Sequence, residues 1–330
     1  MSVELVHVYR GDLVESIHRG DIVLVNHKGE ILDAYGDPYK RTFWRSSAKP
    51  FQVIPFIEAG GIDRYKITAA ELAIMTSSHG GEKRHVTLIK QLLKKMDKTL
   101  DDLKCGRARP MYEGAYRQLL QENIPFSQGN NPCSGKHSGM IGYGLLSGLD
   151  LDSYTELKHP IQQKMLKTIA EMTDLQSEDI DIAIDGCGVP VFGLPIYNMA
   201  LAYAQLAGGD FEHPRKEILA IIAGAMTKEP FYVAGTTRLD TILMEETSGR
   251  ILAKLGAESV YCVSIIGEGI GFAMKTEDGS YRALDAVVPD FLRKHGYISE
   301  EEHKRIYKRL PIQIKNHRDE VVGEMRSVLD

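Results

Sequence analysis

Apolar and polar residues alternate near both ends of the chain, and this two-residue period is typical of β-strands. The runs lie at residues 3–10, 13–26, 30–36, 259–266, 269–279 and 280–288. Asn26–Gly29 predicts a turn within the first group. The last two runs are expected to form a hairpin that turns at Glu277–Gly279.

Between these ends, and again after them, apolar residues recur at the three- and four-residue spacing of amphipathic helices. The predicted helices cover residues 48–61, 67–78, 82–96, 134–148, 153–173, 196–207, 215–226, 285–296 and 300–310. One further strand, at residues 179–195, runs into a turn. This order predicts an α+β fold with a mainly antiparallel sheet built from both chain ends and a helical insertion.

The length of 330 residues suits one catalytic domain that spans residues 1–330. We expect its sheet part at about 1–45 and 250–290, with the C-terminal helices, and its helical part at about 46–249. The formal net charge of −5 favours neither nucleic acid nor an anionic membrane as partner. The sequence shows no signal peptide and no apolar run of roughly 20 residues, so a cytoplasmic location is expected.

The stretch RSSAKPFQ places Ser46 and Lys49 three residues apart at the start of a predicted helix. At that spacing the two side chains share one helix face, so the lysine can reach the serine hydroxyl. Pro50 fits a first helical turn. Two interpretations follow: a serine that caps a helix beside an exposed lysine, or a nucleophile with its general base.

A second hydroxyl-rich stretch, TSSHGGE, ends the predicted helix at residues 67–78. Ser78 is a candidate second nucleophile or proton relay, and His79 alone is more typical of a hydrogen-bonded structural histidine. Turn chemistry by itself also accounts for such a stretch. In AKLGAES, before an apolar strand, Lys254 could present an ammonium to an anion in a cleft or could simply face solvent.

The cysteines are Cys105, Cys133, Cys187 and Cys262, and a reducing compartment would keep them as thiols. Cys133 in GNNPCSGKHSGM and Cys187 in DGCGVP lie in glycine-flanked turns. Two thiolates and a nitrogen ligand would suit zinc, with water as the fourth ligand, and His137 is the first choice for the nitrogen. Two small buried cysteines are the alternative.

Taken in order, SSAKPFQ, SSHGGE, NPCSGKHSGM, DGCGVP and AKLGAES resemble the rhizobial-type L-asparaginases, the asparaginase II family, over roughly residues 5–290. The resemblance implies a fold like that of serine β-lactamases, penicillin-binding proteins and serine-dependent glutaminases. It also implies two Ser–Lys pairs beside a zinc site. By motif the pairs are Ser46 with Lys49 and Ser78 with Lys254, although Lys275 is also a possible partner of Ser78.

The same resemblance assigns the remaining site residues by motif. The zinc ligands are Cys133, Lys136 and Cys187, with lysine bound as the neutral amine. Asp185 is expected to hold the substrate or a metal-bound water, and His79 and Arg45 are further substrate-binding candidates.

The implied activity is hydrolysis of L-asparagine to aspartate and ammonia by a serine nucleophile, with Ser46 favoured, in a homodimeric enzyme. Zn²⁺ would support substrate binding. Three alternatives remain: a glutaminase, since one methylene separates the substrates; a zinc-hydroxide metallohydrolase; and a β-lactam-binding module. The absence of a signal peptide counts against the last.

Overall fold

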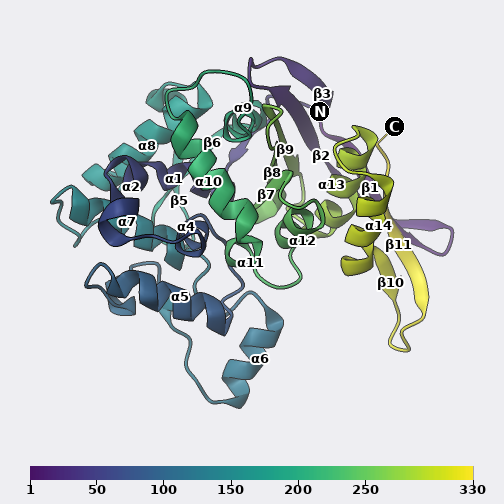
Figure 1. Cartoon of the computed structure of the whole chain (residues 1–330). Coiled ribbons are helices and arrows are strands. Elements are labelled where there is room, and N and C mark those ends of the chain that lie inside the picture. Colours follow the sequence, from purple (N-terminus) through teal and green to yellow (C-terminus); the bar gives the residue numbers. More distant parts are fainter. Residues whose placement is uncertain (330) are drawn as a thin grey trace.

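An antiparallel sheet of eight strands forms the centre of the computed structural model, which describes residues 1–329 (Figure 1). The strands are β1 (Val3–Arg10), β2 (Leu13–Asn26), β3 (Ile31–Tyr35), β7 (Ile251–Gly256), β8 (Val260–Ile265), β9 (Ile270–Thr276), β10 (Gln313–Lys315) and β11 (Val321–Ser327). Their order is β10-β11-β1-β2-β9-β8-β7, and β3 pairs with β2. Segments from the two ends of the chain therefore lie side by side in one sheet.

Both faces of this sheet are buried, as the middle of β2 shows. Ile22 and Leu24 join one hydrophobic core and Val23 and Val25 the other, because successive side chains point to opposite faces of a strand. Helix α9 (Ile196–Leu206) covers one face. The helices α12 (Leu239–Glu246), α13 (Arg282–Lys294) and α14 (Glu300–Arg309) cover the other.

The rest of the chain is mainly helical and lies to one side of the sheet (Figure 1). Its helices are α1 (Lys49–Gln52), α2 (Ile54–Glu58), α3 (Gly61–Tyr65), α4 (Ala69–Met75), α5 (Lys83–Lys94), α6 (Glu113–Gln121), α7 (Ser134–Leu146), α8 (Pro160–Thr173), α10 (Lys216–Lys228) and α11 (Pro230–Val233). A small second sheet has the order β4-β6-β5, formed by β4 (Arg41–Phe43), β5 (Asp181–Ile184) and β6 (Pro190–Pro195). No helix within residues 1–329 is long and apolar enough to cross a membrane.

The prediction of an α+β fold with an antiparallel sheet from both chain ends is confirmed. The predicted strand at residues 280–288 is wrong, because this segment begins α13. Ala283, Val287 and Phe291 are buried there at helical spacing, although Val287 and Val288 favour strands locally. The predicted hairpin at Glu277–Gly279 is therefore absent.

Three further boundaries differ from the prediction. Residues 179–195 form two paired strands, β5 and β6, and not one. Helix α8 begins at Pro160 and not at residue 153, since proline fits the first turn. The chain does not end in helices, because β10 and β11 follow α14 and β11 pairs with β1. All four cysteines are free thiols, as expected.

Candidate active site

A cavity of about 260 Å³ lies where the two parts of the molecule meet, and six of the residues predicted from the sequence line it. They are Arg45, Ser46, Ser78, Cys133, Asp185 and Cys187. They come from the 3₁₀ turn η1 (Arg45–Ala48), the segment after α4, the start of α7 and the β5–β6 turn. Three larger cavities, of about 760, 570 and 420 Å³, contain none of these residues.

Ser78 stands between two buried lysines. The Nζ of Lys254 lies 3.0 Å from the Ser78 Oγ, and the Nζ of Lys49 lies 3.2 Å from the same oxygen. The backbone N–H of Ser78 donates to the Val233 carbonyl and fixes the residue after α4. Three segments that are distant in the sequence thus converge on one hydroxyl.

The hydrogen bonds of Lys49 account for all the hydrogens of an ammonium group. Besides Ser78 Oγ, its Nζ donates to the carbonyl oxygens of Ser77 and of Pro132, the latter at 3.0 Å. The side chain is 1% exposed, and this burial lowers its pKa, with the nearby Lys136 acting in the same direction. Three acceptors around one Nζ are nevertheless the arrangement that a charged lysine requires.

Lys254 has a different environment. Its Nζ has two polar neighbours, Ser78 Oγ and the carbonyl oxygen of Leu255 at 2.7 Å. Complete burial lowers the pKa of Lys254 to about 7. Lys275, the other candidate partner of Ser78, lies on β9 and donates to the carbonyl oxygen of Thr276. Of the two lysines, Lys254 is therefore the one that contacts Ser78.

Ser46 lines the cavity but does not contact its expected partner. Within residues 1–329, no hydrogen bond joins it to Lys49, whose Nζ points inward to Ser77, Ser78 and Pro132. The i, i+3 spacing places both on one turn, but the lysine is long enough to follow the buried acceptors. The preceding residue, Arg45, has a left-handed backbone with φ 52°, a strained conformation that is common at functional sites.

His79 does not line the cavity. The backbone N–H of Gly81 donates to its Nδ1 at 3.1 Å, so Nε2 carries the proton and donates to Ser134 Oγ at 2.9 Å. Burial holds the pKa of His79 well below its usual value. The neutral ring connects the turn after α4 to α7, which is a positioning role and not the substrate contact expected from the sequence.

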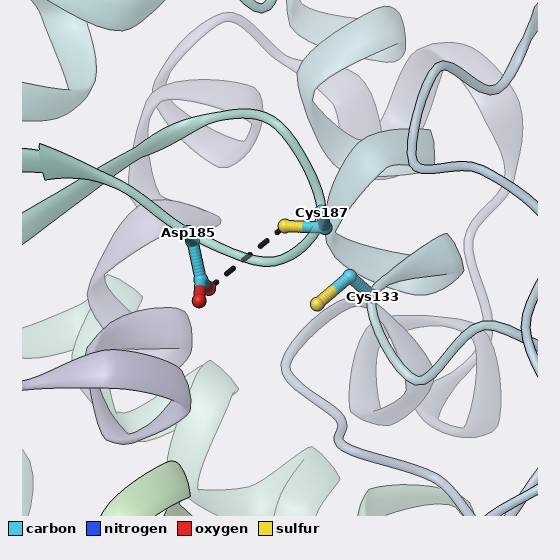
Figure 2. Close-up of side chains that lie close together, drawn as sticks. All are labelled: Cys133, Asp185 and Cys187. Carbon is cyan, nitrogen blue, oxygen red and sulfur yellow. Dashed lines mark hydrogen bonds between the residues drawn. The ribbon is translucent and has the colours of Figure 1, made fainter.

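Beside the serines, Cys133, Asp185 and Cys187 point toward one another (Figure 2). One ligand atom from each of the three lies within 4.8 Å of the others. Cys133 precedes the first turn of α7, while the other two belong to the tight β5–β6 turn. The Nζ of Lys136, in the first turn of α7, donates to Cys187 Sγ at 3.2 Å.

The two thiols of this cluster are not equivalent. A hydrogen bond from Cys133, together with the charge of Lys136, lowers the pKa of Cys187 to about 5 against the effect of burial. The same hydrogen bond and burial raise the pKa of Cys133 to about 12. Burial opposes ionisation of Asp185, but Lys136 and Arg45 lower its pKa overall. Arg45 donates to Asp185 Oδ1 from Nη2 at 2.9 Å and from Nε at 3.1 Å.

This donor set fits a zinc ion. Two sulfurs, an amine and a carboxylate converge in a buried position, and zinc prefers such ligands in tetrahedral geometry. The neighbouring acids raise the pKa of Lys136 despite its burial, so a metal would have to displace its proton. His137, the first choice from residue type, points its Nδ1 to Tyr154 Oη at 2.7 Å and lies outside the cluster.

The sequence reasoning did not find Arg238, Met111 and Tyr281, which also line the cavity. Arg238 lies in the short loop between α11 and α12, in the stretch GTTRLD. Loops that combine glycine, threonine and arginine are common, so this composition alone does not indicate a functional site. Only the packing of α11 and α12 against the site brings this loop to the serines.

Comparisons with known proteins agree with the motifs. The model of the family described as L-asparaginase II matches residues 6–327. A search of curated proteins found no match. Among solved structures, the crystal structure of a putative β-lactamase from Bacteroides dorei DSM 17855 is similar, with 13% sequence identity and a TM-score of 0.42. The similarity covers 88% of this chain and 92% of that one.

Proposed function

Because this chain belongs to the L-asparaginase II family and is an amidohydrolase of the asparaginase type, we propose that it hydrolyses L-asparagine by serine–lysine acyl transfer. The observation that carries the proposal is the position of Ser78 Oγ between Lys254 and Lys49. A serine with one basic and one cationic neighbour has the two groups that an acyl-transfer nucleophile needs.

The hydrogen bonds of the two lysines indicate which one is the charged donor and which one is the general base. Lys49 is surrounded by three acceptors and acts as the charged donor to Ser78 Oγ. Lys254 has one acceptor besides Ser78 and a pKa of about 7, so its neutral amine can accept the hydroxyl proton. We therefore assign Ser78 as nucleophile and Lys254 as base, although the sequence alone favoured Ser46. Ser46, on the same wall, supplies a hydroxyl for substrate binding.

The reaction then runs in two balanced halves. Ser78 Oγ attacks the side-chain amide carbon while its proton passes to Lys254, and a tetrahedral oxyanion forms. The C–N bond breaks, Lys254 returns the proton to the leaving nitrogen, and ammonia departs from an aspartyl ester. Water attacks the ester with Lys254 as base, and aspartate leaves with Ser78 restored. Lys49 remains protonated throughout and stabilises the serine alkoxide electrostatically.

A zinc ion would be held by Cys133, Lys136 and Cys187, with Asp185 beside them. When bound, it would supply a Lewis acid next to the substrate pocket. We expect one zinc per chain by elemental analysis of protein purified without chelator. Cys133→Ala and Cys187→Ala should lose most of it, while Cys262→Ala, which changes a buried cysteine elsewhere, should retain it. Full zinc content in both site variants would refute these ligands.

The serine assignment can be tested by acid-quenching the enzyme during turnover of asparagine and locating the ester by peptide mass spectrometry. Ser78→Ala should lose about 10³-fold or more in kcat and all of the ester, since the nucleophile is gone. Ser46→Ala should keep the ester, with the main change in KM. The control is Ser16→Ala, at an exposed serine on β2. An ester on Ser46 would reverse the assignment.

A metal-hydroxide mechanism is distinguished by the same quench. If zinc-bound hydroxide were the nucleophile, Ser78→Ala would retain turnover and no ester would form on either serine. Parallel ammonia assays with L-asparagine and L-glutamine measure the substrate preference, since a single methylene is worth only about 1–3 kcal/mol in a pocket.

A further inference from the structure

Arg238 is held rigidly at the edge of the catalytic cavity. Its loop is fixed on one side by Glu82, which accepts from the Thr236 N–H at 2.9 Å and from the Thr236 Oγ at 2.8 Å. On the other side, Thr241 Oγ donates to the Gly235 carbonyl at 2.8 Å. The backbone is left-handed at Gly235, with φ 99°, and at Thr237, with φ 59°. The surrounding contacts thus impose the path of the loop.

The guanidinium interacts electrostatically with Asp285 but does not contact it directly. Within residues 1–329 it forms no hydrogen bond or ion pair. Arg45, the other arginine on the cavity wall, already donates two hydrogen bonds to Asp185. Arg238 is half-buried and faces the same space as Ser46 and Ser78. A pocket cation that no protein anion contacts directly can bind an anionic group of a ligand.

Asparagine is a zwitterion, so its pocket must accept a carboxylate as well as an amide. Arginine presents a fixed fork of N–H donors that matches a carboxylate in two parallel hydrogen bonds. We propose that Arg238 binds the α-carboxylate of the substrate and so restricts the enzyme to amides that carry this group. This inference rests on the proposed function, because it concerns the same reaction.

A competing role for Arg238 comes from a second cavity, of about 180 Å³, which shares Arg238, Leu255 and Tyr281 with the first. Its wall includes Asp240 and Asp285, and burial raises the pKa of Asp285 to about 6 while Arg238 opposes that shift. A purely structural Arg238 would only balance these acids. Its loss would then reduce stability and affect every substrate equally.

The test compares L-asparagine with 3-aminopropanamide, which has the same amide and amine but lacks the α-carboxylate. In Arg238→Met, kcat/KM for asparagine should fall about 100-fold, as expected for a lost charged hydrogen-bond partner. The value for 3-aminopropanamide should change by less than about threefold, and Arg238→Lys should recover part of the loss for asparagine. Arg250→Met, at a surface ion pair with Glu302, is the matched control.

An equal loss for both substrates would overturn the proposal and leave the charge-balancing role. Calorimetric binding of the product, L-aspartate, decides the question without turnover. The wild type should bind it, and Arg238→Met should bind it at least about tenfold more weakly. If the wild type does not hydrolyse asparagine, the proposed function fails. The binding measurement still tests whether Arg238 binds the carboxylate of aspartate. Equal aspartate affinity in the two proteins, or none in the wild type, would overturn the assignment.

Discussion

At the scale of single residues, Lys254 shows how burial gives a lysine the pKa that the proposed general base requires. It is 0% exposed, and desolvation disfavours its ammonium form more than the nearby Asp240 favours it. A lysine in water is almost fully charged at pH 7. With a pKa of about 7, half of the Lys254 amines are neutral there and able to accept the proton of Ser78.

This shift predicts a pH profile. In the proposed mechanism the neutral amine of Lys254 is the active form, and its fraction grows as pH rises. The value of kcat/KM should therefore increase about tenfold per pH unit below 7 and level off above it. The rising part, or limb, of this pH profile therefore lies below the range of roughly pH 8–10 that a lysine with a less strongly lowered pKa would give. Initial rates of ammonia release from pH 5 to 10 measure it. Lys275→Met should leave the limb in place.

A profile that is flat from pH 5 to 10, or that peaks below pH 6, would exclude Lys254 as the base. A limb near pH 9 would instead show that Lys254 is less shifted than its burial requires. The measurement should use zinc-loaded protein throughout, because metal binding at the proposed site would displace a proton from Lys136 and add its own pH dependence.

At the scale of elements, the packing of α7 on α4 brings the candidate metal ligands next to Ser78, the proposed nucleophile. Gly135 lies in the first turn of α7, between the candidate ligands Cys133 and Lys136. A methyl group at Gly135 would overlap the carbonyl oxygen of Ile74, which belongs to α4 and cannot move independently. Glycine is required here for close approach of two backbones.

Gly135→Ala should therefore destabilise the protein by about 1–3 kcal/mol, the usual cost of overpacking, even though alanine favours helices. Urea unfolding and zinc content should both show the effect, because α7 moves with its ligands. The matched control is Gly224→Ala in α10, where a methyl group meets nothing within 4 Å. That variant should be as stable as the wild type or more stable, by up to about 1 kcal/mol. Equal stability of the two variants would disprove the close-contact argument.

At the scale of the whole molecule, the sheet ties the two ends of the chain together. Strand β1 pairs with β2 on one side and with β11, more than 300 residues later in the chain, on the other. Met325 on β11 is 9% exposed and packs into the core beneath α13. The C-terminal strand is therefore part of the domain and not an appendage.

Met325→Asp should reduce the free energy of unfolding by about 3 kcal/mol or more, because it buries a carboxylate without a partner. Val321→Asp, on the same strand but 54% exposed, should change it by less than about 0.5 kcal/mol. Thermal unfolding followed by circular dichroism compares the two. Similar melting temperatures for both variants would mean that β11 does not pack as described.

The sequence by itself determined the features that depend on local periodicity and on motif. The alternation at β1, β2 and β3 predicted these strands almost to the residue. The pattern of apolar and polar residues at neighbouring positions reflects which faces of a strand are buried. The motifs around Ser46, Ser78, Cys133 and Cys187 identified groups that the cavity does bring together. Local signals failed at the start of α13, where a strand was predicted over residues 280–288, and at β11. In both places packing against the sheet outweighed the intrinsic preferences of the segment.

Only the tertiary structure decided which groups touch. Ser78 and Lys254 are 176 residues apart, and no local pattern encodes their hydrogen bond. The spacing of Ser46 and Lys49 suggested a contact, but the long lysine side chain instead reaches buried acceptors contributed by two other segments. Arg238 entered the site for the same reason. A side chain's proton and partners are set by the burial and the acceptors around it, and these exist only once distant segments have packed together.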